Sequence, residues 1–199
     1  SVCRPITTKP MKTFDISKID KSWTLFLDRD GVINKRLPGD YVKHVHEFEL
    51  LPGVPEAIRI FSQTFGRVVV VTNQQGIGKG FFSVEQLRDV HAHLLEKINE
   101  AGARIDAVYF APNLASENSP MRKPGIGMAL QAKSDFPEID FSKALMLGDS
   151  VSDLQFGRAA GMFTGFVTSE KELEADCKNL SDLEIPSLYA FAIRLQNNS

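Results

Sequence analysis

Five short apolar segments, separated by longer amphipathic stretches, constrain the fold of this chain more than any other feature. The apolar segments span residues 23–27, 67–71, 107–110, 144–147 and 163–167. Each is uninterrupted rather than alternating, which is typical of parallel strands that are buried on both faces. The stretches at 54–65, 84–101, 126–136 and 152–160 have helix-like patterns. This order predicts a doubly wound, Rossmann-like α/β fold, with a parallel sheet of about five strands and helices on both faces.

The composition fits one globular domain. Of the 199 residues, 43% are hydrophobic, which is enough to bury a sizeable core. The polar, irregular start predicts an N-terminal extension over residues 1–21, followed by a single domain over 22–199. We expect the tail after Thr168 to form one or two helices against an edge of that domain.

The charge distribution argues against polyanionic partners. The formal net charge is −2 and neither half of the chain is strongly basic, so we expect neither nucleic acid nor a membrane as a partner. The chain shows no apolar run long enough to span a bilayer and no signal-like start. Cys3 and Cys177 lie far apart in flanking segments, which favours reduced thiols and a cytoplasmic location.

Acidic residues follow the first apolar segment, where the chain leaves the predicted sheet. In doubly wound sheets, ligands bind beyond the carboxyl ends of the strands. Asp28 and Asp30 occupy this position, and Gly31 permits a sharp turn. Two carboxylates so close favour a divalent cation, and Mg²⁺ suits because it needs few carboxylates besides water and substrate phosphate. Taken alone, the pair could equally cap a turn.

The second and third segments are followed by groups that could bind phosphate. Thr72 offers a hydroxyl, and the backbone N–H groups that follow it, including that of Asn73, are further donors. Arg122 and Lys123 together could offset the negative charge that phosphoryl transfer concentrates. In isolation, a strand-end turn and a solvated surface pair are the commoner explanations.

The fourth segment ends in further carboxylates. Asp149 lies at the strand tip, where it can complete a metal site, whereas Asp153 or Ser152 could cap the helix that follows. All of these groups thus fall at or just beyond strand ends: the carboxylate pair, the hydroxyl, the basic pair and this third carboxylate. Independent accidents explain that coincidence poorly, so we expect one metal and phosphate site.

A glycine-rich stretch at residues 75–80 follows the second strand. It matches neither a Walker loop, because of Asn73 and Gly80, nor the dinucleotide fingerprint, because of Phe81. We expect its glycines to form a flexible rim, with Lys79 placed to contact substrate.

With these motifs, the chain resembles phosphatases of the haloacid-dehalogenase (HAD) superfamily from Trp23 to Val167. The four ordered motifs of that superfamily are matched by Asp28 with Asp30, Thr72, Lys123, and Asp149 with Asp153. The fuller strings FLDRDGVIN at 26–34, VTNQ at 71–74 and RKP at 122–124 resemble one branch in particular. That branch holds histidinol-phosphate and D-glycero-D-manno-heptose-1,7-bisphosphate phosphatases.

The resemblance implies a magnesium-dependent phosphomonoester hydrolase. Asp28 would be the nucleophile that forms an aspartyl-phosphate, and Asp30 the general acid and then base. Magnesium would bind Asp28, the main-chain carbonyl of Asp30, and Asp149, with Asp153 orienting these groups.

The remaining motif residues would act on phosphate or substrate. Thr72 and Lys123 would stabilise the transferring phosphoryl group. Asn73, Arg122 and Lys79 are the predicted substrate-binding residues.

The chain departs from the branch in one loop. Many heptose-bisphosphate phosphatases carry cysteine and histidine zinc ligands just before the Arg-Lys-Pro motif, but residues 112–121 contain neither residue type, so we expect no zinc. The intervals between motifs leave no room for a separate cap domain, and short loops would then select the substrate. We expect a small phosphorylated metabolite, such as the sugar phosphate heptose bisphosphate, with histidinol phosphate as the alternative.

Other functions stay open. A receiver-like signalling module also accepts phosphate on an aspartate, although the length of the chain and the Asp28–Asp30 spacing favour hydrolysis. A catalytically idle binding domain and phosphotransfer to another alcohol are further alternatives. The sequence leaves the oligomeric state undecided and is compatible with a monomer.

Overall fold

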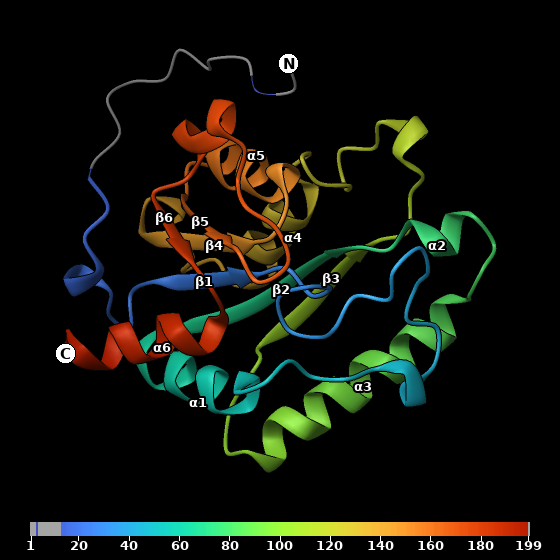
Figure 1. Ribbon diagram of the computed structural model, residues 1–199, viewed down its shortest axis with the longest axis horizontal. Coiled ribbons are helices and arrows are strands. Elements are labelled where there is room, and N and C mark those ends of the chain that lie inside the picture. The colour runs from blue at the N-terminus through green and yellow to red at the C-terminus, as the bar shows by residue number, and fades with distance from the viewer. Residues whose placement is uncertain (1–2, 4–12, 199) are drawn as a thin grey trace.

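The protein is built around one parallel β-sheet. The computed structural model describes residue 3 and residues 13–198, and its six strands follow the order β3-β2-β1-β4-β5-β6, with every neighbouring pair parallel (Figure 1). The strands are Thr24–Leu27 (β1), Arg67–Asn73 (β2), Ala107–Ala111 (β3), Ala144–Gly148 (β4), Phe163–Val167 (β5) and Leu183–Ile185 (β6).

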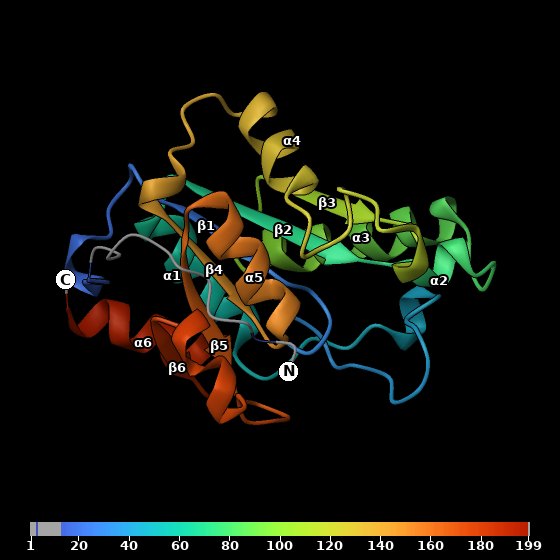
Figure 2. The same cartoon turned by 90° about the horizontal axis from the view of Figure 1, so that it is seen from above.

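Helices cover both faces of the sheet. The α-helices are Val54–Thr64 (α1), Gln75–Gly78 (α2), Val84–Glu100 (α3), Gly127–Asp135 (α4), Val151–Ala160 (α5) and Leu188–Asn197 (α6). The 3₁₀-helices are Ile16–Lys18 (η1), Val45–Glu47 (η2), Ala115–Glu117 (η3), Phe141–Lys143 (η4) and Ala175–Leu180 (η5). Helices α1, α3 and α6 lie on one face, and α4 and α5 lie on the other (Figures 1 and 2). The predicted α/β class is therefore confirmed.

The sheet has six strands, whereas the sequence predicted about five. The additional strand, β6, lies at the edge beside β5. It has only three residues, and its central Glu184 is exposed, so it produces no recognisable apolar run. The tail after Thr168 consequently contains a 3₁₀-helix, a strand and a helix rather than helices alone.

Side chains of β1 alternate between two hydrophobic cores. Leu25 and Leu27 belong to the core beneath α1, α3 and α6, whereas Phe26 belongs to the core beneath α4 and α5. All three are fully buried. Because both faces of the strand are covered, apolar side chains are favoured at successive positions, which explains the run of apolar residues from Leu25 to Leu27.

Strand register brings the predicted site residues to one edge of the sheet. Leu27 pairs with Val70 of β2 and with Leu147 of β4. The next residue, Asp28, donates its backbone N–H to the carbonyl of Leu147 at 3.0 Å. The polar residues at the carboxyl ends of β1, β2 and β4 therefore emerge side by side.

The N-terminal segment contacts the core where the structure describes it. Phe14, Ile16 and Ile19 pack against the larger hydrophobic core, and the Phe14 ring lies 5.4 Å from that of Phe163. Residues 1–2 and 4–12 of the predicted extension lie outside the described residues. The division of the chain after residue 21 stays a prediction.

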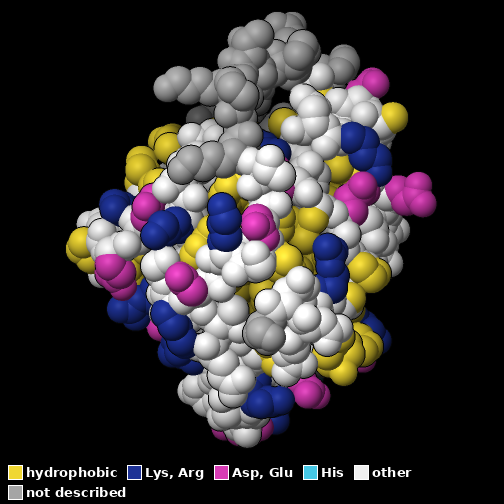
Figure 3. Space-filling model, turned by 90° about the vertical axis from the view of Figure 1, so that its left-hand side faces the viewer, with side chains coloured by type: hydrophobic (Ala, Val, Ile, Leu, Met, Phe, Trp, Pro, Cys, Tyr) yellow, Lys and Arg dark blue, Asp and Glu magenta, His cyan; other side chains and the backbone are white. Residues whose placement is uncertain are grey.

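Charged groups of both signs are mixed on the surface shown in Figure 3. Lysine and arginine side chains alternate with aspartate and glutamate there, and no single-sign patch dominates this face. None of the helices within residues 13–198 is long and apolar enough to cross a membrane.

Cys3 and Cys177 form a disulfide, with their Cα atoms 5.5 Å apart. The expectation of reduced thiols was therefore wrong. Cys177 lies in η5, where it packs with Leu154, Phe166 and Leu180. The two cysteines are 174 positions apart, so their spacing could not reveal the pairing. Because disulfides are rare in the cytosol, cysteine usage no longer supports the predicted cytoplasmic location.

We expect the disulfide to be measurable as missing thiols and as added stability. Denatured, unreduced protein should contain no titratable thiol, and reduced protein should contain both. Reduction should lower the free energy of unfolding by about 2–4 kcal/mol, because the cross-link restricts the unfolded chain. Urea unfolding with and without reductant measures this difference. Cys3→Ser is the control, since reductant should not change its stability; an equal effect on both proteins would contradict the prediction.

Candidate active site

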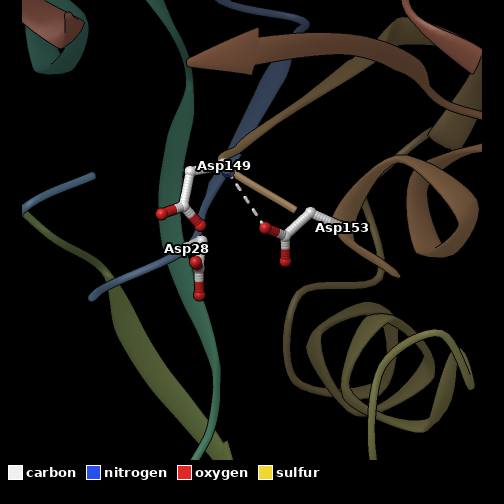
Figure 4. Close-up of side chains that lie close together, drawn as sticks. All are labelled: Asp28, Asp149 and Asp153. Carbon is white, nitrogen blue, oxygen red and sulfur yellow. Dashed lines mark hydrogen bonds between the residues drawn. The ribbon is translucent and has the colours of Figure 1, made fainter. Parts of the chain in front are cut away.

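Three buried carboxylates meet at the carboxyl edge of the sheet. Asp28 follows β1, Asp149 follows β4, and Asp153 lies in the first turn of α5 (Figure 4). One oxygen from each lies within 4.8 Å of the others, and the residues are only 8%, 2% and 1% exposed. Negative charges this close and this poorly hydrated require cations nearby.

Lys123 supplies one such cation. Its Nζ atom lies 2.9 Å from Asp28 Oδ1 and 2.7 Å from Asp153 Oδ1, and it donates to the Val71 carbonyl at 2.7 Å. Burial alone would lower the pKa of Lys123, but the charges of Asp153 and Asp28 raise it above its ordinary value. Lys123 is therefore a permanent ammonium ion.

The Asp28 carboxyl responds to the same surroundings. Burial raises the pKa of Asp28 well above its ordinary range, the nearby charge of Asp153 adds to the rise, and Lys123 opposes it. A further cation beside Asp28 would favour its ionised form, which is the form that a nucleophile needs.

Asn73 fixes the backbone of Lys123. The Asn73 side chain donates to the Lys123 carbonyl at 3.1 Å and accepts from the Lys123 N–H at 3.0 Å. Asn73 is the last residue of β2, so the rigid sheet sets the position of the lysine. The sequence predicted Asn73 to bind substrate, and it does line the cavity beside Asp28.

Asp153 holds the turn that carries Asp149. Its Oδ2 atom accepts hydrogen bonds from the backbone N–H groups of Asp149 and Ser150, both at 3.1 Å. Gly148 is required here, because a Cβ at that position would lie 2.3 Å from the Asp153 side chain. The N-cap residue of α5 is Ser150, and Asp153 is its N3 partner in a capping box. Asp153 also orients Lys123 and Asp149.

Asp30 lies beside the cluster in a separate network. Its carboxylate accepts hydrogen bonds from Arg29 at 2.8 Å, Asn34 at 3.0 Å and Gln74 at 3.0 Å. Gln74 also donates to the hydroxyl of Thr72 at 2.9 Å. Burial would raise the pKa of Asp30, but the charge of Arg29 and these hydrogen bonds bring it below its ordinary value. Asp30 is therefore ionised.

Arg29 is fully buried behind Asp30 and was not foreseen as a site residue. Its Nη1 atom lies 3.1 Å from Nε2 of His91 on α3. Burial, together with the charge of Arg29, lowers the pKa of His91 to about 3. The neutral imidazole therefore accepts a hydrogen bond from Arg29. His91 lies far from Arg29 in the chain, so no sequence motif connects them.

A cavity of about 240 Å³ opens above the carboxylates. Asp28, Asp30, Asp149, Arg122 and Lys123 line it, and residues 36–37 and 40–42 form part of its wall. The Arg122 Nη1 atom is buried without a hydrogen-bond partner among the described residues, so it can receive an anionic group.

Two predicted residues lie away from the cavity in the described part of the chain. Thr72 is buried and contacts Gln74 rather than lining the cavity. Lys79 follows α2, a helical turn formed by the glycine-rich stretch; the predicted flexibility of this stretch stays a prediction. The Lys79 Nζ atom lies 3.1 Å from the hydroxyl of Tyr41, a residue that does line the cavity.

The oxygen atoms at this edge suit a divalent metal ion. Asp149 Oδ1 is buried and has no hydrogen-bond partner within the part of the chain that the structure describes. Asp28 and Asp30 line the same cavity, and the main-chain carbonyl of Asp30 accepts a hydrogen bond from Arg36 Nη2, which also donates to Asp149. An all-oxygen donor set with few carboxylates is the kind that Mg²⁺ prefers.

Comparison with known proteins identifies the family. The family model described as "Polynucleotide kinase 3 phosphatase" matches residues 19–183. The chain belongs to this phosphatase family. The predicted resemblance to HAD phosphatases is thereby confirmed, as is the prediction that the protein is an enzyme.

Curated relatives share most of their length with this phosphatase. The D-glycero-alpha-D-manno-heptose-1,7-bisphosphate 7-phosphatase of Mycobacterium tuberculosis is 35% identical over 171 residues, which cover 86% of this chain and 90% of the relative. The corresponding beta-heptose enzyme of Rhodopseudomonas palustris is 35% identical over 165 residues, covering 78% and 88%.

A similar solved structure is D,D-heptose 1,7-bisphosphate phosphatase from B. bronchiseptica, complexed with magnesium and phosphate. It has a TM-score of 0.77 and 27% sequence identity, and the match covers 89% of this chain and 99% of that one.

We expect His91 to make the phosphatase acid-sensitive. Unfolded His91 binds a proton below about pH 6.5, whereas the folded residue does not until about pH 3. Stability should therefore fall on acidification through this window by up to about 1.4 kcal/mol per pH unit. Urea unfolding of wild type and His91→Gln at pH 7 and pH 5 measures the difference. His93→Gln is the control on the same helix, and identical pH dependence in wild type and His91→Gln would contradict the assignment.

Proposed function

We propose that the phosphatase is a magnesium-dependent phosphomonoester hydrolase that acts on a small sugar phosphate, specifically a heptose 1,7-bisphosphate. The observation that carries this proposal is that Asp28 lines the cavity with Lys123 Nζ 2.9 Å from its Oδ1 atom and a carboxylate oxygen of Asp149 within 4.8 Å. The names of the curated relatives support the choice of sugar.

In the first step, a carboxylate oxygen of Asp28 attacks phosphorus, and the bond from phosphorus to the sugar oxygen breaks. Lys123 lies against Asp28 and stabilises the charge on the transferring group. Asp28, the Asp30 carbonyl and Asp149 would hold Mg²⁺, which neutralises phosphoryl oxygens when bound. Arg122 would bind the anionic part of the substrate that projects from the cavity.

Asp30 moves the protons in both steps. It protonates the leaving sugar oxygen and then removes a proton from the water that hydrolyses the aspartyl-phosphate. In this structure, Asp30 is an ionised base whose carboxylate accepts hydrogen bonds from Arg29, Asn34 and Gln74. The negative charge of a bound phosphate would raise the pKa of Asp30 and so load the proton needed for the first step.

The oligomeric state, the binding partners and the cellular compartment are separate proposals. We propose a monomer without nucleic acid or membrane partners, in keeping with the low net charge and the mixed surface of Figure 3. The cytoplasmic prediction depends on whether the Cys3–Cys177 disulfide forms in cells, which thiol blocking during extraction would measure.

Replacing the nucleophile should abolish turnover. We expect Asp28→Asn to lower magnesium-dependent phosphate release by roughly three orders of magnitude or more, because an amide cannot form the acyl-phosphate. Asp89→Asn, an exposed change on α3, is the matched control and should retain wild-type turnover. Wild-type activity in Asp28→Asn would show that another residue attacks phosphorus.

A substrate panel tests the choice of sugar. The alpha and beta anomers of heptose 1,7-bisphosphate, histidinol phosphate and a 3′-phosphorylated oligonucleotide should be compared by phosphate release in Mg²⁺. We expect a heptose bisphosphate to have the highest kcat/KM, because the cavity is small and offers more than one cation. A preference for the oligonucleotide, the substrate class suggested by the family model's description, would overturn the sugar assignment.

A further inference from the structure

Arg36 contacts the same oxygen atoms that are proposed to hold magnesium. Its Nη2 atom donates to Asp149 Oδ2 at 2.8 Å and to the main-chain carbonyl of Asp30 at 3.0 Å. One nitrogen therefore bridges two of the proposed metal ligands. The Arg36 side chain is 45% exposed, whereas that of Asp149 is 2% exposed, so the arginine reaches in from solvent to a fixed, buried carboxylate.

The chain leaves room for this contact. Gly31 has a positive φ of 82°, and a Cβ at this position would lie 2.2 Å from Asp149 Oδ2 and 3.2 Å from Arg36 Nη2. A side chain at position 31 would therefore collide with both groups. The glycine that allows the turn after β1 also allows the guanidinium to approach Asp149.

We propose that Arg36 is a displaceable counter-ion of the metal site. This inference rests on the proposed magnesium site: Arg36 and the divalent cation compete for Asp149 and the Asp30 carbonyl. A coordinated cation contacts these oxygens directly. A guanidinium on the same two oxygens would then lie against the positive charge of the metal ion, and the two cations would repel each other. Binding of the metal ion therefore releases Arg36.

The released arginine has a second acidic partner within reach. Arg36 Nε lies 3.9 Å from Glu170 Oε2, and Glu170 is exposed in the loop after β5. The Ser169 hydroxyl donates to the Gly31 carbonyl at 3.2 Å, which keeps this loop beside the turn. Arg36 therefore keeps an acidic neighbour, Glu170, when it leaves Asp149.

Competition of this kind lowers the apparent affinity for the metal ion. A site that is free of its internal counter-ion for only one-tenth of the time binds its ligand about tenfold more weakly than a permanently free site. In return, Arg36 stabilises the buried Asp149 carboxylate whenever the metal ion is not bound. Arg36 thus affects the metal-free and metal-bound proteins in opposite directions.

The test compares Arg36→Met with Lys35→Met. The neighbouring Lys35 is also a surface cation, but it pairs with Glu49 at 2.7 Å, away from the site. Calorimetric titration with Mg²⁺ should show a Kd about tenfold lower for Arg36→Met than for wild type, and no change for Lys35→Met. The Tm of Arg36→Met should be lower than wild type in EDTA, and its rise on adding Mg²⁺ should be larger.

A merely structural role for Arg36 would lower the Tm equally with and without Mg²⁺ and leave the Kd unchanged. That result, or weaker Mg²⁺ binding by folded Arg36→Met, would overturn the inference. Glu170→Gln gives a second test should Arg36→Met fail to fold. Its Kd for Mg²⁺ should rise, because displaced Arg36 loses its alternative partner, and an unchanged or lower Kd would count against the inference.

The outcomes separate this inference from the proposed function. If wild type binds Mg²⁺, Asp149→Asn does not, and Arg36→Met matches wild type, only the counter-ion inference fails. If Arg36→Met binds Mg²⁺ where wild type does not, the inference is supported. If no variant binds Mg²⁺, both the inference and the proposed metal dependence are wrong.

Discussion

Repulsion among three buried carboxylates governs the arrangement of this site. The oxygens of Asp28, Asp149 and Asp153 lie within 4.8 Å of one another, where water can screen them little. Such a cluster opposes folding unless positive charge is supplied. Lys123 contacts Asp28 and Asp153, and Arg36 contacts Asp149. Two cations therefore face three carboxylates, and a divalent ion would favour the ionised form of the cluster.

The two cations are held very differently. Lys123 is buried, and Asn73 fixes its backbone from the end of β2. Arg36 lies in a loop, and its side chain is 45% exposed. Its guanidinium contacts Asp149 and the main-chain carbonyl of Asp30. The sheet thus supplies a permanent charge where phosphoryl transfer needs one. The loop supplies a removable charge where a metal ion must enter and leave.

The sequence predicted the parts of this arrangement that strand ends determine. Burial on both faces makes each central strand an unbroken apolar run, and parallel register then brings Asp28, Asn73 and Asp149 to one edge. Arg36 and the Cys3–Cys177 disulfide were not predicted, because loop conformation brings distant residues together without a repeating pattern. The edge strand β6 was missed for another reason, since three residues with an exposed centre carry too little periodic signal.

Arg29 shows how the site separates two charge networks that lie side by side. Beyond the end of β1, Asp28 lines the cavity, whereas the next residue, Arg29, is fully buried in the protein. There Arg29 has one anionic partner, Asp30, and one neutral partner, His91. Since a protonated His91 would place two cations 3.1 Å apart, the positive charge of Arg29 is directed at Asp30. The Asp30 carboxylate can therefore remain a base beside the carboxylate cluster. Its main-chain carbonyl belongs to the other network, where Arg36 donates to it.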